Sequence, residues 1–338
     1  MSVAVASVED VKRRWESRLL RLRNVTGVGV GIKYVKGRPT GEKCIVVFVS
    51  RKLPKEELNP RDIVPAEIEG VKTDVREAVF KALTTPEEKQ KKWRPAKGGV
   101  SIGHYSITAG TLGCLVKDKT DGEKVILSNN HVLAASNQGK VGDPILQPGS
   151  YDGGRVETDT IARLKRFIPI EFEQDSTCPI AKGFCTVYNA LAKVFGAKTR
   201  LVTVKEVYNT VDCAIASPIS PNVVSDDVID IGVPQGVVMP QVGLKVKKSG
   251  RTTCLTHGEI DTVDLTVRVM YDYKTALFRD QIGIQPSQGL FSSGGDSGSA
   301  IVTEDEAKLV GLLFAGSSSG YTIANKIQNV MEELNVTI

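Results

Sequence analysis

The 338-residue sequence has no continuous apolar stretch near the length of about 18 residues that a membrane-spanning helix requires. Its first six residues run directly into Glu9 and Asp10, which leaves no apolar segment typical of a secretory signal. The basic residues are spread out, and no basic run is interleaved with aromatic side chains as in a nucleic-acid-binding surface. The net charge of +5 therefore reflects solubility. We expect a cytoplasmic protein that binds neither membranes nor nucleic acids.

Cysteine and histidine are scarce, with six and three residues respectively. Most cysteines lie in apolar, strand-like stretches, which favours buried free thiols over disulfides. Cys178 and Cys185 have no histidine nearby, which argues against a zinc site, while a local disulfide between them stays open as an alternative. We expect no metal and no organic cofactor.

The stretch Gly-Gly-Asp-Ser-Gly-Ser at residues 294–299 is the most informative motif, and it directly precedes an apolar strand-like run. A serine hydroxyl becomes a nucleophile only when a base takes its proton, and the resulting oxyanion needs fixed N–H donors. Glycine at 295 allows the backbone to turn so that its N–H and that of Ser297 face one concavity. Alone, the motif is only moderately specific, because a polar turn between strands has the same composition.

Two further residues stand in matching contexts. His131 follows the apolar run at 125–127, and Asp212 precedes the small apolar residues at 213–216. With Ser297, these residues resemble in type and in order the triad of chymotrypsin-like (trypsin-like) serine peptidases. The resemblance covers roughly residues 97–338. It implies Ser297 as nucleophile, His131 as base, Asp212 as the group that orients the base, and backbone N–H groups of Gly295 and Ser297 as the oxyanion hole.

The same resemblance implies supporting and specificity residues. Ser-Gly-Arg-Thr-Thr at 249–253 resembles a strand of secreted bacterial relatives, which implies that Arg251 pairs with Asp296 and holds the oxyanion loop in place. By family register the substrate-binding residues are Phe291 at the base of the specificity pocket, with Phe314, Ala315 and Gly316 on its wall. None is acidic, so an apolar residue before the scissile bond is favoured over a basic one.

The N-terminal region has its own pattern. Residues 7–23 predict an amphipathic helix capped by Ser7, and strands are predicted at 27–34 and 42–49. The stretches Gly-Val-Gly-Val-Gly and Val-Val-Phe-Val-Ser-Arg-Lys-Leu-Pro resemble the domain that precedes the peptidase in a bacterial group of trypsin-like proteins related to the plant leaf-width protein NAL1. No helix follows the spaced glycines, so they do not indicate a phosphate-binding loop.

We predict a mainly β fold: a chymotrypsin-like double β-barrel, six strands in each barrel, with a C-terminal helix over 322–334. A small N-terminal α+β domain at 1–80, regulatory or used in assembly, precedes a linker at 81–99 and a peptidase domain at 100–338. A helical insertion at about 171–206, centred on 181–195, would restrict substrate access or form an oligomer contact.

The predicted function is a serine endopeptidase that hydrolyses a specific intracellular protein or peptide substrate. The alternative is an oligomeric scaffold or sensor whose peptidase domain is latent until a partner activates it. A homo-oligomer would form through the N-terminal domain or the insertion.

Overall fold

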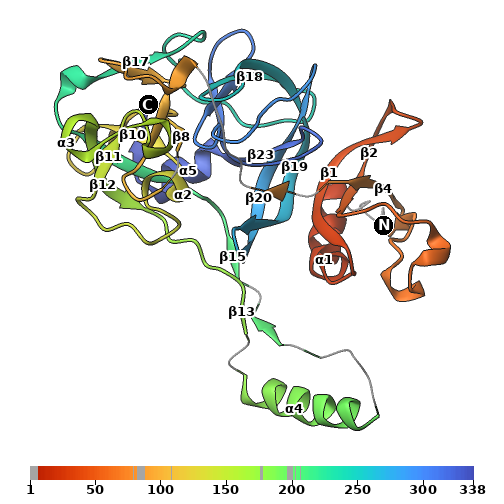
Figure 1. Cartoon of the computed structure of the whole chain (residues 1–338). Helices are drawn as coiled ribbons and strands as arrows, with labels where there is room; N and C mark the ends of the chain where they lie inside the picture. The colour runs from red at the N-terminus through yellow and green to blue at the C-terminus, as the bar shows by residue number, and fades with distance from the viewer. Residues whose placement is uncertain are drawn as a thin grey trace.

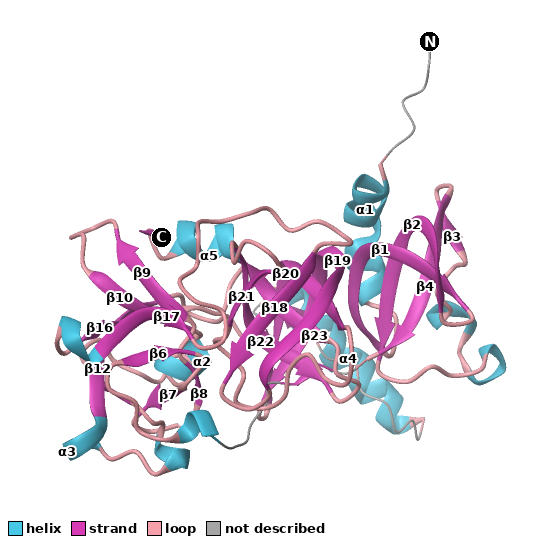
Figure 2. Ribbon diagram, turned by 90° about the horizontal axis from the view of Figure 1, so that it is seen from above, coloured by secondary structure: helices cyan, strands magenta, loops and turns pink. Residues whose placement is uncertain are grey.

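The computed structural model describes residues 7–78, 80–81, 88–107, 109–175, 178–195, 201, 203–205 and 207–338. The chain is mainly β, as predicted, with two large sheets that lie side by side (Figure 2). Among the described residues, no helix combines the length and apolar character needed to cross a membrane.

The larger of the two sheets, called the second sheet because its barrel is formed by the C-terminal part of the chain, contains a closed, six-stranded barrel. In order around the ring, each strand pairs with the next and the last pairs with the first, all antiparallel. The strands are β18 (Lys245–Gly250), β19 (Cys254–Tyr271), β20 (Lys274–Pro286), β23 (Thr322–Lys326), β22 (Leu309–Ser317) and β21 (Ala300–Thr303). Aliphatic side chains such as Ile260, Ile282 and Leu313 fill its interior. The predicted second barrel is therefore confirmed.

The C-terminal helix is shorter than predicted. Helix α5 spans Ile327–Glu333, whereas Thr322–Lys326 is strand β23, because its main chain pairs with β20 on one edge and with β22 on the other. Helical spacing of Ile323 with Ile327 in the sequence did not reveal this tertiary pairing.

The first sheet has eight strands, more than the six predicted, because the two-residue strands β24 and β8 extend its edges. Its order is β24 (Val336–Thr337), β9 (Cys114–Asp118), β10 (Lys124–Ser128), β16 (Ala214–Pro218), β12 (Thr160–Phe167), β11 (Pro144–Leu146), β7 (Ser101–His104) and β8 (Gly110–Thr111). The predicted hairpin is the β9–β10 pair, where Gly122 has a positive φ of 76°. Nearby, β6 (Ala96–Gly98) pairs in parallel with β17 (Val224–Val228), and helix α3 spans Val156–Asp159.

At the N-terminus, helix α1 (Val8–Leu20) begins as predicted at Ser7, whose Oγ accepts a hydrogen bond from the Asp10 N–H at 3.1 Å. Strands β1 (Val25–Val35) and β2 (Arg38–Val49) form a hairpin whose turn is only Lys36 and Gly37. The strands β4 (Val71–Glu77) and β3 (Glu67–Ile68) complete this region, with β4 parallel to β2.

The N-terminal strands continue the sheet of the second barrel. The first part of the long strand β19 pairs with β18, and its next residues pair with β1, from Gly31↔Thr262 to Gly27↔Val267. Glycine is required at this contact, since a Cβ on Gly29 would lie 2.2 Å from the Thr262 methyl group. Val46 and Phe48 share a hydrophobic core with Val267 and Phe278 of the barrel. One continuous sheet thus links the two parts of the chain (Figure 1).

The insertion contains the predicted helix, α4, which spans Pro179–Val194. It is connected to the rest of the chain through the short pair β13 (Gln174–Asp175) and β14 (Val204–Lys205), and Figure 1 shows it projecting away from both sheets. This position gives no support to a role in covering the site. After it, β15 (Tyr208–Asn209) pairs in parallel with β20.

The cysteines divide into two groups. Cys44, Cys114 and Cys213 are buried free thiols as predicted, and burial raises the pKa of Cys44 to about 11 and that of Cys114 to about 12. Cys254 and Cys178 are exposed and Cys185 is half-buried, so the prediction of burial is wrong for these three.

We expect Gly31→Ala to weaken the junction between β1 and β19. A Cβ there would lie 2.5 Å from the Asp261 carbonyl oxygen, so the strands must separate, at a loss of about 1–3 kcal/mol in the free energy of unfolding. Denaturant titration measures the loss. The control is Gly183→Ala on α4, where nothing lies within 4 Å, and stability there should stay equal or rise. Equal stability of Gly31→Ala and the parent would contradict the close approach.

Candidate active site

The three residues predicted as a triad come from separate elements that meet between the two sheets. His131 lies in the short helix α2 (Asn130–Leu133) directly after β10, and Asp212 lies two residues before β16. Because Ser128 of β10 pairs with Ala214 of β16, His131 and Asp212 emerge at the same end of the first sheet. Ser297 lies in the loop that precedes β21 of the second barrel, and its carbonyl accepts the Thr111 N–H at 2.7 Å.

The histidine and the aspartate form a direct pair. His131 Nδ1 is 2.5 Å from Asp212 Oδ2, and the His131 backbone N–H donates to Oδ1 at 3.2 Å. The Asp212 side chain is fully buried. Since an ionised carboxylate only accepts hydrogen bonds, the proton of the neutral imidazole lies on Nδ1, and Nε2 is left with a free lone pair. The ring is thus held in the tautomer that a general base requires.

A residue that sequence reasoning missed also holds this carboxylate. The Tyr271 hydroxyl, at the end of β19, donates to Asp212 Oδ2 at 2.8 Å. Burial, together with the charge of Asp212, raises the pKa of Tyr271 well above its ordinary value, so the hydroxyl stays a donor. Asn129 donates to the Asp212 carbonyl at 2.7 Å, and Asn325 accepts its N–H at 3.0 Å. A single tyrosine at a strand end has no spacing signal that could have revealed it.

The serine hydroxyl is not bonded to the histidine. Ser297 Oγ donates to the Phe314 carbonyl at 3.5 Å, and within the described residues no hydrogen bond joins it to His131. Because catalytic hydrogen bonds are often long or unformed before substrate binds, this missing bond does not exclude His131 as the base for Ser297.

The loop around Ser297 presents two N–H groups without acceptors. Within the described chain, the N–H groups of Gly295 and Ser297 donate to no protein atom. Gly295 has φ of +87°, and a Cβ on it would lie 2.4 Å from Arg251 Nη1, so only glycine fits. Thr111 Oγ1 donates to the Gly295 carbonyl at 2.7 Å and fixes the peptide. This arrangement can bind an oxyanion next to the serine.

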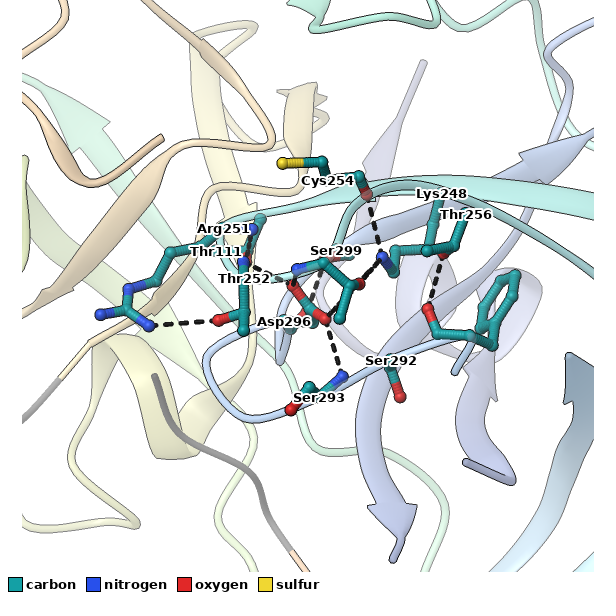
Figure 3. Close-up of polar contacts among 12 residues, drawn as sticks. Thr111, Lys248, Arg251, Thr252, Cys254, Thr256, Ser292, Ser293, Asp296 and Ser299 are labelled. Carbon is teal, nitrogen blue, oxygen red and sulfur yellow. Dashed lines mark hydrogen bonds and ion pairs between the residues drawn. The ribbon is translucent and has the colours of Figure 1, made fainter. Parts of the chain in front are cut away.

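The buried carboxylate of Asp296 organises this loop (Figure 3). It accepts hydrogen bonds from the N–H groups of Ser293 at 2.8 Å, Thr252 at 2.8 Å and Thr253 at 3.1 Å. The Thr253 hydroxyl donates at 2.7 Å, and Lys248 Nζ lies 3.7 Å away. Burial lowers the pKa of Lys248 to about 8, although the charge of Asp296 opposes this shift.

The predicted pairing of Arg251 with Asp296 is wrong. The Arg251 guanidinium, 1% exposed, instead forms a bidentate pair with Asp152, with Nε donating to Oδ2 at 2.7 Å and Nη2 to Oδ1. The physical reason is that backbone N–H groups, the Thr253 hydroxyl and Lys248 already occupy the oxygens of Asp296, while Asp152 reaches Arg251 from the short 3-10 helix Ser150–Asp152 that follows β11. Arg251 still backs the loop, because its guanidinium packs under Gly295.

The four predicted substrate-binding residues, Phe291, Phe314, Ala315 and Gly316, are buried. Phe291 packs in the core of the second barrel with its ring 5.8 Å from Lys248 Nζ, and Phe314 packs 4.7 Å from the Phe278 ring. A cavity of about 680 Å³ opens instead beside His131, and none of these four is among the described residues that line it. Its walls include Phe172, the tip of the β19–β20 hairpin at 270–274, and four residues after His131, namely Val132, Ala135, Ser136 and Gln138. The specificity pocket therefore stays a prediction.

The other two histidines have structural partners. His257 pairs with Glu304 at the surface. His104 is buried, with Nδ1 2.7 Å from Ser106 Oγ and Nε2 3.0 Å from Asp143 Oδ2. This second group resembles a triad in composition, but Ser106 lies only two residues from His104 and belongs to no glycine-rich loop like that of Ser297.

Comparisons with known proteins agree with the resemblance found in the sequence. Residues 11–78 match the NARROW LEAF 1 N-terminal domain. Protein NARROW LEAF 1 of Oryza sativa subsp. japonica is 26% identical over 343 residues, which cover 91% of this chain and 53% of the rice protein. The chain thus spans about half the length of that relative.

Among solved structures, the chain is similar to a Nocardiopsis protease, with TM-score 0.44 and 16% identity, covering 71% of this chain and 97% of that one. It is also similar to Thermobifida fusca Protease A, with TM-score 0.45, 15% identity and coverage of 71% and 96%. A glutamic acid specific serine protease gives TM-score 0.43, 18% identity and coverage of 71% and 98%.

The depressed pKa of Lys248 makes stability depend on pH. Between about pH 8 and pH 10.5, Lys248 is protonated in the unfolded chain but not in the folded chain. The contribution of Lys248 to the free energy of unfolding therefore increases as the pH rises. The gain is at most about 1.4 kcal/mol per pH unit. Urea midpoints of the parent and of Lys248→Met between pH 7.5 and 10 test this. The midpoint of the parent should rise relative to that of the variant as the pH increases. Parallel curves would refute it.

Proposed function

We propose that this protein is a serine endopeptidase that hydrolyses peptide bonds through Ser297, His131 and Asp212. The proposal is supported chiefly by the pair that His131 forms with the buried Asp212, beside a serine loop whose two N–H groups have no acceptor in the described part of the chain. A histidine with a purely structural role would not need free N–H groups nearby, and a loop with a purely structural role would not need an oriented imidazole. Together, the two provide a general base and oxyanion donors for the same serine.

In the proposed mechanism, Ser297 Oγ attacks the carbonyl carbon of the scissile peptide bond while His131 Nε2 accepts its proton. The carbonyl oxygen becomes an oxyanion, bound by the N–H groups of Gly295 and Ser297. His131 then passes the proton to the leaving amine, and the C–N bond breaks to give an acyl-enzyme. A water molecule attacks this ester with His131 again as base, and Ser297 is regenerated.

Asp212 and Tyr271 act through the histidine. The carboxylate stabilises the imidazolium that forms in each step and prevents the ring from turning. The Tyr271 hydroxyl donates a hydrogen bond to Asp212 Oδ2 and so fixes the carboxylate relative to His131 Nδ1. Tyr271 is therefore a positioning residue contributed by the second barrel to a histidine of the first sheet.

We propose a protein or peptide substrate in the cytoplasm, with an apolar residue before the scissile bond. The preference rests on the family resemblance, by which Phe291 and residues 314–316 stand where an acidic residue would select a basic side chain, and none of them is acidic. The proposed chemistry needs neither a metal nor an organic cofactor.

Ser297→Ala should abolish covalent labelling by a serine-directed fluorophosphonate and reduce kcat for peptide hydrolysis by about four to six orders of magnitude. The matched control is Ser106→Ala, which removes a hydroxyl from the other histidine–aspartate pair. Labelling of that variant should equal that of the parent. Undiminished labelling of Ser297→Ala would reject the proposed nucleophile.

We also propose that the protein forms a homo-oligomer through helix α4, as a scaffold function would require. Ile180, Phe184, Val187, Leu191 and Val194 are all exposed on α4, and they follow one another at alternating spacings of four and three residues. That spacing places them along one face, the pattern of helices that pack against a second helix. An N-terminal contact between subunits finds less support, because β1 already pairs with β19 of the same chain.

Replacing Phe184 and Leu191 together by serine should convert the assembly to a monomer in sedimentation velocity experiments. Because both side chains are exposed within one chain, the unfolding midpoint of the monomer should change little. Lys182→Ser, on the same helix, serves as the control and should retain the assembly. An unchanged sedimentation coefficient for the double variant would contradict the proposal.

A further inference from the structure

The edge of strand β22 on the side of the serine loop continues beyond that loop. Strand β21 pairs with β22 only as far as Leu312. Beyond Leu312 the serine loop pairs with β22. The Gly298 N–H donates to the Leu313 carbonyl at 2.8 Å, and the Leu313 N–H donates to the Ser299 carbonyl at 3.0 Å. The next residue, Phe314, accepts the Ser297 hydroxyl. The main chain at Gly316 and Ser317 thus continues the same edge directly past the nucleophile.

A segment of the chain itself occupies this edge. Strand β5, Phe80–Lys81, pairs antiparallel with β22, with Lys81 opposite Gly316 and Phe80 opposite Ser317. Its other edge pairs in parallel with β19, where Lys81 lies opposite Met270. Met270 precedes Tyr271, whose hydroxyl holds Asp212. Strand β5 therefore lies between the two strands that contribute Phe314 and Tyr271 to the site.

Strand β5 also runs in the direction that leads toward Ser297. In the antiparallel register, the step from Phe80 to Lys81 runs from Ser317 to Gly316, which is toward Phe314 and hence toward Ser297. A peptide substrate that added to this edge would use the same main-chain groups. Strand addition depends on backbone hydrogen bonds and is indifferent to most side chains, so two extended segments compete for one edge.

We propose that strand β5 is an intramolecular occupant of the binding site for extended peptide substrates, and that a substrate must displace it. This inference rests on the proposed peptidase function. A tethered segment has an effective concentration on the order of millimolar, so it competes strongly even when its intrinsic affinity is low. The apparent affinity for substrate falls in proportion to the fraction of molecules in which the edge is free.

The pairing is made by the main chain, so the test uses substitutions that separate backbone from side-chain effects. Lys81→Pro removes an N–H and restricts the backbone, whereas Lys81→Ala keeps the strand. Two substrates with the same apolar residue before the scissile bond are compared: a tetrapeptide anilide, which reaches Gly316, and an ester of the single residue, which does not. If Lys81→Pro fails to fold, the double variant Phe80→Gly with Lys81→Gly replaces it.

We expect Lys81→Pro to raise kcat/KM for the tetrapeptide at least tenfold, mainly through a lower KM, and to change kcat/KM for the ester less than twofold. Lys81→Ala should match the parent on both substrates. Equal kcat/KM of the parent and Lys81→Pro on the tetrapeptide, with fluorophosphonate labelling of Ser297 intact, overturns the inference alone. Absence of labelling in every variant overturns the proposed function instead.

Discussion

The buried carboxylate of Asp296 is the constraint on which the site depends. A charge that is removed from water must be satisfied by hydrogen bonds, and here three backbone N–H groups and a threonine hydroxyl provide them. These donors come from the serine loop and from the segment after β18, so the carboxylate ties one to the other. The left-handed turn at Gly295 and the direction of its N–H follow from that connection. The loop that carries the proposed oxyanion site is thus held in place without any change in the chain's covalent structure.

The second barrel contributes to both halves of the site. It provides Ser297 and also, through Tyr271, a hydrogen bond to the aspartate of the first sheet. Strand β8 of the first sheet in turn provides Thr111, and the segment after its strand β11 provides Asp152; these residues fix Gly295 and Arg251 of the barrel. Because each sheet positions residues of the other, a small rotation between the sheets would disturb the proposed base and the proposed oxyanion site together.

The sequence was most informative where local chemistry determines structure. The cap at Ser7, the turn at Gly122 and the glycine-rich serine loop each have local signals, and the structure contains them. The order of His131, Asp212 and Ser297 indicated a triad, although their proximity depends on strand pairings. The partner of Arg251 was missed because Asp152 lies 99 positions away and reaches it only in the folded chain. Non-local contacts likewise made Thr322–Lys326 a strand despite its helical spacing.

The continuous sheet across β1 and β19 also determines how the protein would respond to a nick in its chain. The N-terminal strands are attached by main-chain pairing, by a shared core and by the ion pair of Arg76 with Asp261. None of these contacts depends on the covalent connection between the two parts. Cleavage between β4 and the first sheet would therefore leave two fragments that stay associated, like the subunits of a heterodimer. Such a product would migrate as one particle in solution and as two chains only after denaturation.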